Sequence, residues 1–235
     1  MNREEQCTLL REGSLEVLGR VHGSSNQALL VAVTLDGVTA QACYKAEAGE
    51  RPLWDFPDGL WRREVAAYAL DVALGTDLVP PTVEREDAPF GIGSLQWWIE
   101  DTHDDHYFTL RERPEFFDWF ADLAAFDVVA NNADRKAGHV LFDTTRCWAI
   151  DNGLCFHQED KLRTVIWEYA GLRVAPQLLE RIDDFARGDG ARLGQWLSPH
   201  EVALAQMRAR GLVESSYYPT PDDDSDWPPY PWPLI

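Results

Sequence analysis

The order in which strand-like and helix-like segments follow one another constrains the fold of this chain most. Residues 15–45 contain two apolar, β-branched runs, LEVLGRV and ALLVAVTL, and a third short run, QACYKAE. A polar stretch at 22–27 separates the first two runs, and the turn-forming pair Asp36-Gly37 separates the last two. Such runs between turn residues predict β-strands. Ahead of them, residues 1–14 indicate a short polar helix or arm.

A helix follows this strand region and leads to two more strands. Residues 59–74 carry apolar side chains at helical spacing, and Gly75 is a typical helix end. The next strands are expected near 81–85 and 94–100, after an extended entry at Pro80-Pro81. The first hundred residues therefore predict a small sheet with one strong helix.

Helices dominate the chain from about residue 113 onward. The run PEFFDWFADLAAFDVVANN predicts a long helix that ends in an Asn-rich turn, and further helices are expected near 160–170, 176–186 and 199–210. HVLF and CWAID predict a short hairpin with Asp143 and Thr144 at its turn. Because a doubly wound sheet would alternate strands and helices throughout, this order favours an α+β fold with a β-rich N-lobe and a helical C-lobe.

The composition changes sharply near the end of the chain. We expect one domain over 1–213, with an N-lobe at about 15–101 and a C-lobe at about 107–213. Residues 214–235 contain six Pro and an Asp cluster, which predicts an extended or disordered tail whose Trp and Tyr residues could dock onto the body. An alternative role for Asp222–Asp224 is to occupy the cleft as a charge mimic of substrate, and truncation after Val213 would test it.

The charge of the chain excludes several classes of partner. Its net charge is −19, from 21 basic and 40 acidic residues, and such a field repels nucleic acid and anionic membrane surfaces. The charged N-terminus lacks an apolar signal segment. Four widely spaced cysteines without a CxxC pair indicate reduced thiols. We expect a cytoplasmic monomer without a nucleic-acid partner and without stable membrane insertion.

Two acidic segments point to chemistry. The run from Asp127 to His139, DVVANNADRKAGH, begins on a helix and crosses a polar turn, and AIDNG places Asp151 at the end of an apolar strand. The separation of Asp134 from Asp151 leaves room for a hairpin that brings both carboxylates to one site. Phosphoryl transfer needs one carboxylate for the attacking hydroxyl and a second for the Mg²⁺ that bridges the phosphates.

A lysine and a glutamate complete this pattern. Lys45 ends a strand and Glu64 lies on the first strong helix, so Glu64 could hold Lys45 against nucleotide phosphates. The small polar turn at 22–27 could cap phosphate oxygens with its backbone N–H groups. Plainer explanations exist: Lys45 could be a snorkelling lysine, Glu64 could pair with a neighbouring arginine, and His139 could be a structural histidine, because Mg²⁺ prefers oxygen ligands.

The run from Asp127 to Leu141 resembles the catalytic loop of type II phosphatidylinositol 4-kinases and of the wider phosphatidylinositol 3-/4-kinase superfamily. AIDNGLCF at 149–156 is similar to their metal-binding segment, and GSLQWWIED at 93–101 is similar to their hinge strand. The resemblance covers roughly residues 17–160, and it extends to a family of short actinobacterial proteins described as distant relatives of these kinases. It implies a protein-kinase-like fold that uses ATP with Mg²⁺ or Mn²⁺.

The resemblance also implies a role for each matching position. Asp134, followed by Arg135, would be the catalytic aspartate. Asp151 would be the principal metal ligand, and His139 stands where the family has a second ligand, usually Asn. Lys45 would bind the α-phosphate and Glu64 would pair with it. The remaining nucleotide contacts would come from Gly23, Ser24, Ser25 and Asn26 over the phosphates, from the backbone of Gln96 to Ile99 at the adenine, and from Ile150 against its ring.

Three departures from the family's pattern argue against a lipid as the acceptor. The phosphate loop keeps one glycine, Gly23, and both the cysteine cluster for lipid anchoring and the basic membrane-facing surface are missing. We therefore predict ATP- and Mg²⁺-dependent transfer to an alcohol group of a protein or small-molecule acceptor, with a lipid kept among the small molecules. The alternatives are a nucleotide-binding pseudokinase that serves as an interaction module, and an enzyme that transfers a nucleotidyl group instead.

Overall fold

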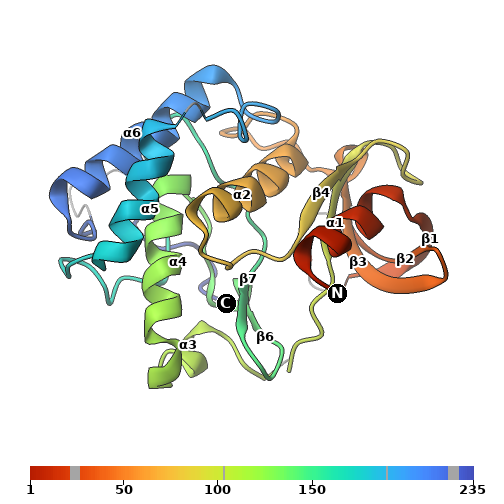
Figure 1. Ribbon diagram of the computed structural model, residues 1–235, viewed down its shortest axis with the longest axis horizontal. Helices are drawn as coiled ribbons and strands as arrows, with labels where there is room; N and C mark the ends of the chain where they lie inside the picture. Colours follow the sequence, from red (N-terminus) through yellow and green to blue (C-terminus); the bar gives the residue numbers. More distant parts are fainter. Residues whose placement is uncertain (22–26, 103, 189, 222–227) are drawn as a thin grey trace.

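The computed structural model describes residues 1–21, 27–102, 104–188, 190–221 and 228–235. It confirms the α+β architecture, with a five-stranded antiparallel sheet in the N-lobe and mainly helices in the C-lobe (Figure 1). The strand order is β1-β2-β3-β5-β4. The strands of this sheet are β1 (Ser14–Arg20), β2 (Ala28–Leu35), β3 (Val38–Ala46), β4 (Thr82–Arg85) and β5 (Gly93–Trp97).

The β2–β3 hairpin turns at the predicted pair. Asp36 and Gly37 both have positive φ, at 50° and 80°, which is the backbone signature of a tight turn whose twist matches the flanking strands. Helix α1 (Arg3–Glu12) precedes the sheet and buries Cys7, Leu9 and Leu10 against it. The N-terminal segment is therefore part of the core of this lobe, which its mostly polar composition does not reveal.

Helix α2 (Leu60–Leu74) has the predicted bounds to within one residue. Gly59 and Gly75 flank it in left-handed conformations, and the Glu50 carboxylate accepts hydrogen bonds from the first backbone N–H groups of the helix. In Figure 1 the helix lies between the sheet and the C-terminal helices. Its small inner side chains, such as Ala66 and Ala67, belong to the same buried core as those helices, so α2 joins the two lobes.

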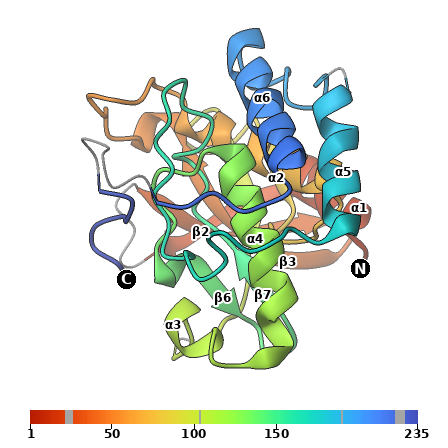
Figure 2. The same cartoon turned by 90° about the vertical axis from the view of Figure 1, so that its left-hand side faces the viewer.

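The C-lobe is built around three long helices, seen side by side in Figure 2. The predicted hairpin is present, with Thr144 at positive φ in its turn. The prediction of a helix near 160–170 is wrong, because the structure has no helix between β7 and α5. That segment is irregular because its backbone pairs with residues 132–135 and with Pro229 instead of with itself. The elements of this lobe are α3 (Tyr107–Leu110), α4 (Phe117–Ala130), β6 (Val140–Phe142), β7 (Cys147–Ala149), α5 (Pro176–Arg187) and α6 (Pro199–Ser215).

The described parts of the tail lie against the body. Tyr218 is buried, its hydroxyl donates to Ala121 O, and its backbone pairs with Gly171 and Leu172. The tail aromatic at this position therefore docks. Asp222–Asp224, for which a role in the cleft was considered, lie outside the described residues.

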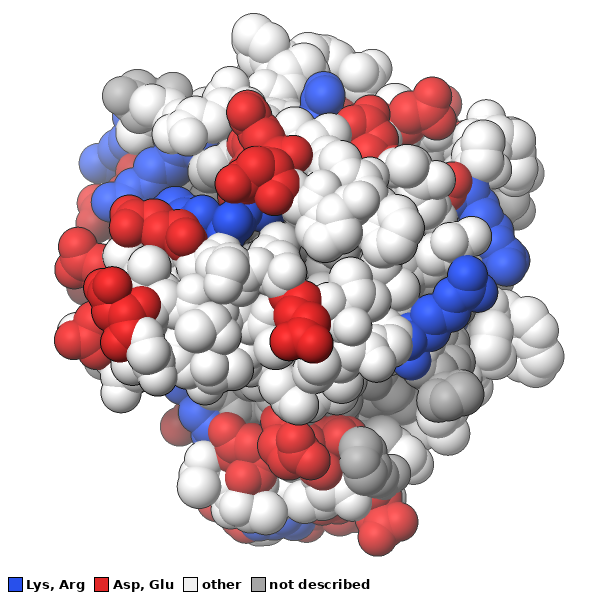
Figure 3. All heavy atoms as spheres, turned by 90° about the vertical axis from the view of Figure 1, so that its right-hand side faces the viewer, with Lys and Arg blue, Asp and Glu red and all other residues white. Residues whose placement is uncertain are grey.

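The surface of the N-lobe end is mixed in charge. Among the described residues of the face in Figure 3, Lys and Arg side chains form separate groups, and the rest of the face is uncharged or acidic. The four cysteines are all free thiols. None of the described helices combines the length and the apolar character that a membrane span requires.

Candidate active site

Lys45 is the centre of a charged cluster contributed by three elements. It lies near the end of β3, and its Nζ contacts the carboxylate of Glu64 on α2 and, at 2.7 Å, Oδ1 of Asp151 just after β7. Burial alone would lower the pKa of Lys45, but Asp151 and Glu64 beside the ammonium raise that pKa above its ordinary value. Lys45 is therefore charged, and two carboxylates hold it in place.

Glu64 also fixes the segment that carries Asp151. Its Oε2 accepts the backbone N–H of Asn152 at 3.0 Å while its other oxygen faces Lys45. Gly153 also packs beside Glu64, since a Cβ there would lie 3.4 Å from Glu64 Oε1, in ordinary van der Waals contact. The predicted pairing of Lys45 with Glu64 is thus present, and the surface pairing of Glu64 with a neighbouring arginine is not.

Asp151 faces the cleft as an ionised carboxylate. Its backbone has a φ of 59°, in the left-handed region, and its side chain is 45% exposed. Lys45 holds the pKa of Asp151 well below its usual range. The other oxygen, Oδ2, lies 3.3 Å from His139 Nε2. A carboxylate held open to the cleft in this way is available to a cation.

His139 is neutral in this arrangement. Burial lowers its pKa to about 4, and its Nδ1 accepts the backbone N–H of Lys136 at 3.4 Å. The ring proton therefore sits on Nε2, the ring nitrogen that lies 3.3 Å from Asp151 Oδ2. In this tautomer His139 orients Asp151, and direct metal binding through Nε2 would need the proton to move to Nδ1.

Asp134 opens onto the same cavity as Lys45 and Asp151. The cavity has a volume of about 240 Å³, and all three residues line it together with Glu64. Burial raises the pKa of Asp134 above its ordinary value, and its ion pair with Lys136 at 2.9 Å opposes that rise. The two acids of the sequence pattern therefore converge on one space.

Arg135 lies beneath the cavity, in a fully buried network. Its guanidinium donates to the Asp127 carboxylate at 3.0–3.2 Å, to Ile150 O at 2.8 Å and to Asn152 Oδ1 at 2.6 Å. Asn132 Nδ2 donates to the same Asp127 carboxylate. Because the side chains of Arg135, Asp127, Asn132 and Asn152 are all buried and bonded, Arg135 positions the loop and does not reach an acceptor.

Asp127 and Asn152 are the residues that the sequence interpretation left without a role. Asp127 was noted only as the start of the motif, and Asn152 only as a neighbour of Asp151. Both are polar residues in apolar surroundings: Asp127 lies near the end of an apolar helix, and Asn152 lies next to a short buried strand. Because buried polar groups need hydrogen-bond partners, this pattern could have predicted their role in a buried network. Together they connect α4, the loop at 131–136 and the segment after β7.

The described residues expected at the adenine end do not line this cavity. Gln96 is inside β5 with its side chain buried and donating to Thr82 Oγ1 at 2.9 Å. Ile99 is buried and Ile150 is partly buried. None of the three is among the described residues that line the cavity. Gly23, Ser24, Ser25 and Asn26 lie outside the described residues.

The donor groups of the site fit a magnesium ion that is shared with phosphates. No group of three or more His, Cys, Asp or Glu side chains within the described ranges is spaced to hold a metal by itself. Mg²⁺ in phosphoryl-transfer sites is commonly held by one or two carboxylates, with phosphate oxygens and water completing its shell. Asp151 offers such a carboxylate, and Asp134 lines the same cavity.

No protein-family model matches the chain. The chain is 36% identical to Protein Rv2133c of Mycobacterium tuberculosis over an alignment 272 positions long, which covers 99% of this chain and 96% of that protein. Its fold is similar to that of the Helicobacter pylori proinflammatory kinase CtkA, with a TM-score of 0.52 at 10% identity over 89% of this chain and 94% of that one. It is also similar to hydra Fam20 solved with a sugar, with a TM-score of 0.57 at 12% identity over 88% of this chain and 87% of that one. These structures show a kinase-like fold.

Proposed function

The chain belongs to the same family as Protein Rv2133c of Mycobacterium tuberculosis, and we propose that it is an ATP- and Mg²⁺-dependent phosphotransferase with an alcohol acceptor. One observation carries this proposal. Lys45, Asp134 and Asp151, which come from β3, the loop after α4 and the segment after β7, line one cavity in a kinase-like fold. A cation for phosphate, a carboxylate for the hydroxyl and a carboxylate for the metal are the parts that phosphoryl transfer requires.

Each residue has a distinct role in this proposal. Lys45 neutralises phosphate charge, and Glu64 holds Lys45 in place. Asp134 accepts or orients the proton of the attacking hydroxyl, and its raised pKa makes it a better proton acceptor than an ordinary aspartate. Asp151 would hold Mg²⁺, with His139 keeping its carboxylate oriented. When bound, the ion would neutralise charge on the phosphates, so catalysis would rest on positioning and electrostatics.

We place the chain beside the phosphatidylinositol 3-/4-kinase superfamily on the strength of its Asp134-Arg135 and Asp151-Asn152-Gly153 motifs. The acceptor would be a protein or a small molecule rather than a lipid in an anionic membrane, because the net charge is −19. The proposed setting is a cytoplasmic monomer without a nucleic-acid partner. The boundary of the domain after residue 213 stays a prediction, and α6 runs on to Ser215.

The test of this proposal is the variant Asp134→Asn. Loss of the carboxylate should lower turnover of ATP about 100-fold or more, while the affinity for ATP stays within about twofold, because Lys45 and Asp151 hold the nucleotide. Turnover is followed with γ-labelled ATP in Mg²⁺ and in Mn²⁺. Asp118→Asn, on the exposed face at the start of α4, is the control and should behave as the wild type. Undiminished transfer by Asp134→Asn would remove Asp134 from its role.

A nucleotide-binding pseudokinase is the second candidate function. The imidazole of His139 in place of an amide oxygen favours it, because Mg²⁺ prefers oxygen ligands. A pseudokinase would show a metal-dependent thermal shift with ATP and no modified product. Intact mass spectrometry separates the remaining alternative, since phosphoryl and nucleotidyl groups add different masses to the acceptor.

A further inference from the structure

The last residues of the chain return to the loop that carries Asp134 and His139. Leu234 O accepts the backbone N–H of Ala137 at 2.8 Å. Ile235 Cγ2 lies 4.0 Å from the position that a Cβ on Gly138 would occupy. Ala137 is fully buried, and it lies between the two site residues in sequence. The C-terminal end therefore supports this loop from outside the cavity.

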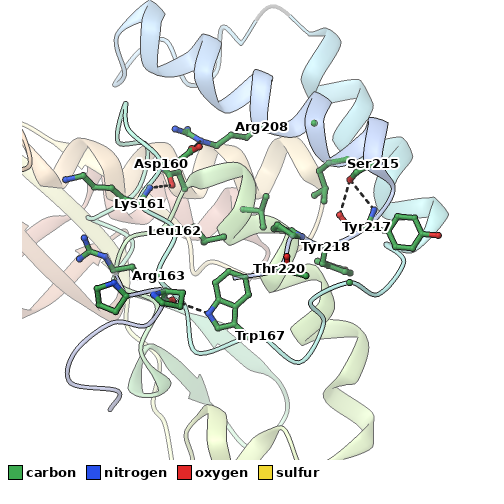
Figure 4. Close-up of a pocket in the computed structure, with 18 residues that line it drawn as sticks. Asp160, Lys161, Leu162, Arg163, Trp167, Arg208, Ser215, Tyr217, Tyr218 and Thr220 are labelled. Atoms are coloured by element: carbon green, nitrogen blue, oxygen red, sulfur yellow. Dashed lines mark hydrogen bonds and ion pairs between the residues drawn. The ribbon is translucent and has the colours of Figure 1, made fainter. Parts of the chain in front are cut away.

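Pro229 gives the tail a second connection to the same loop. Its carbonyl oxygen accepts the backbone N–H of Thr164 and the Nε1–H of Trp167, both at 3.1 Å. The bond from Trp167 is drawn as a dashed line in Figure 4. On either side of Thr164, Arg163 N donates to Asn132 O at 2.9 Å and Val165 N donates to Arg135 O at 3.1 Å. A displacement of the tail would therefore also displace residues 132–135, because residues 163–165 are bonded to both segments.

The docking of residues 228–235 is separate from the docking of Tyr217 and Tyr218. A cavity of about 690 Å³ lies between the tail and the body (Figure 4). Tail residues on both sides of the undescribed segment form part of its wall, and α6, residues 160–167, Val128, Asn131 and Gly171 form the rest. The last eight residues have hydrogen bonds of their own to the body, through Pro229 O and Leu234 O.

We propose that residues 228–235 are a positioning segment for the catalytic loop, a proposal that rests on the proposed phosphotransferase function. They hold Ala137 and Thr164 so that Asp134 keeps its place opposite the nucleotide. Their loss leaves Lys45 and Glu64 in place, because those two residues are supported from β3 and α2 and pair with each other. A small displacement of a catalytic group lowers the rate of the chemical step far more than it lowers nucleotide binding.

Removal of residues 228–235 tests this proposal through a split between kcat and KM. The expected result is a fall in kcat of about 10- to 100-fold, with the KM for ATP changed less than about twofold. Tyr230→Ala, which removes an exposed side chain of the same segment, is the control and should keep full kcat. An unchanged kcat after truncation would overturn the proposal, and a raised kcat would show that the tail inhibits the enzyme instead.

Amide hydrogen exchange tests the same proposal without any turnover. In the full chain the N–H groups of Ala137 and Thr164 should be protected, and in the truncated chain both should exchange faster while the amides of α4 do not change. Removal of Leu234 and Ile235 alone should release Ala137 and leave Thr164 protected, which keeps the test available if the longer truncation does not fold. Unchanged exchange at Ala137 would contradict the proposal. A full chain without transferase activity but with this exchange pattern would contradict only the proposed function.

Discussion

At the scale of single residues, the site depends on one lysine that two carboxylates share. Glu64 is almost fully buried and Asp151 is half exposed. The free-energy cost of losing Lys45 as a counterion therefore differs between the two carboxylates. A buried charge without its partner is costly, whereas an exposed one is hydrated. The Lys45–Glu64 pair should therefore matter for folding, and the Lys45–Asp151 pair mainly for binding.

Lys45→Met tests this division. It should abolish the thermal shift with ATP and lower the free energy of unfolding by about 2–4 kcal/mol, because Glu64 is left buried without a counterion. The double variant Lys45→Met, Glu64→Gln should regain part of that free energy and none of the binding. Urea unfolding and ATP titration measure both effects. Equal stability of the single variant and the wild type would contradict the electrostatic account of Glu64.

His139 offers a second residue-scale prediction. In the tautomer described, its Nε2 carries the ring proton and has no lone pair for a metal, so His139→Asn should add an oxygen ligand and lower the Mg²⁺ concentration for half-maximal turnover several-fold. His200→Asn, on the exposed surface of α6, is the control. A higher Mg²⁺ requirement in His139→Asn would mean that the imidazole itself binds the ion.

At the scale of elements, α2 is fixed to the C-lobe. Arg63 Nη1 donates to Cys155 O at 2.7 Å, and the guanidinium pairs with Glu201 at the start of α6. The inner side chains of α2 also share the C-lobe core. In protein kinases an ion pair between a strand lysine and a helix glutamate must be in place for activity, and the proposed function gives Lys45 and Glu64 that role. Here its helix is bonded to the lobe that carries Asp151.

Arg63→Met tests the role of this anchor. Removal of the guanidinium leaves Glu201 without its partner, so the free energy of unfolding should fall by about 3 kcal/mol, and turnover should fall with it because Glu64 loses its fixed position. Arg62→Met on the exposed side of the same helix should change neither quantity by much. Equal effects of the two substitutions would show that α2 is held by its apolar contacts alone.

At the scale of the whole molecule, the sequence predicted the elements whose structure depends on neighbouring residues along the chain. The strands of the sheet, α2 with its flanking glycines and the hairpin after Asp134 follow from apolar periodicity and turn residues, and they sufficed to place Asp134 and Asp151 together. Residues 160–170 were mispredicted as a helix because their backbone partners lie at 132–135 and 229, far away in sequence. The burial of Arg135 was missed for the same reason, since its partners come from three separate segments.

Metal-dependent ATP binding is the most direct test of the central claim that Lys45, Asp134 and Asp151 form one nucleotide site. Calorimetric titration of ATP into the wild type should show binding that Mg²⁺ or Mn²⁺ strengthens, and Asp151→Asn should lose that dependence on metal while retaining weak binding through Lys45. ATP affinity that is the same with and without metal, and the same in the wild type and in Asp151→Asn, would contradict the account.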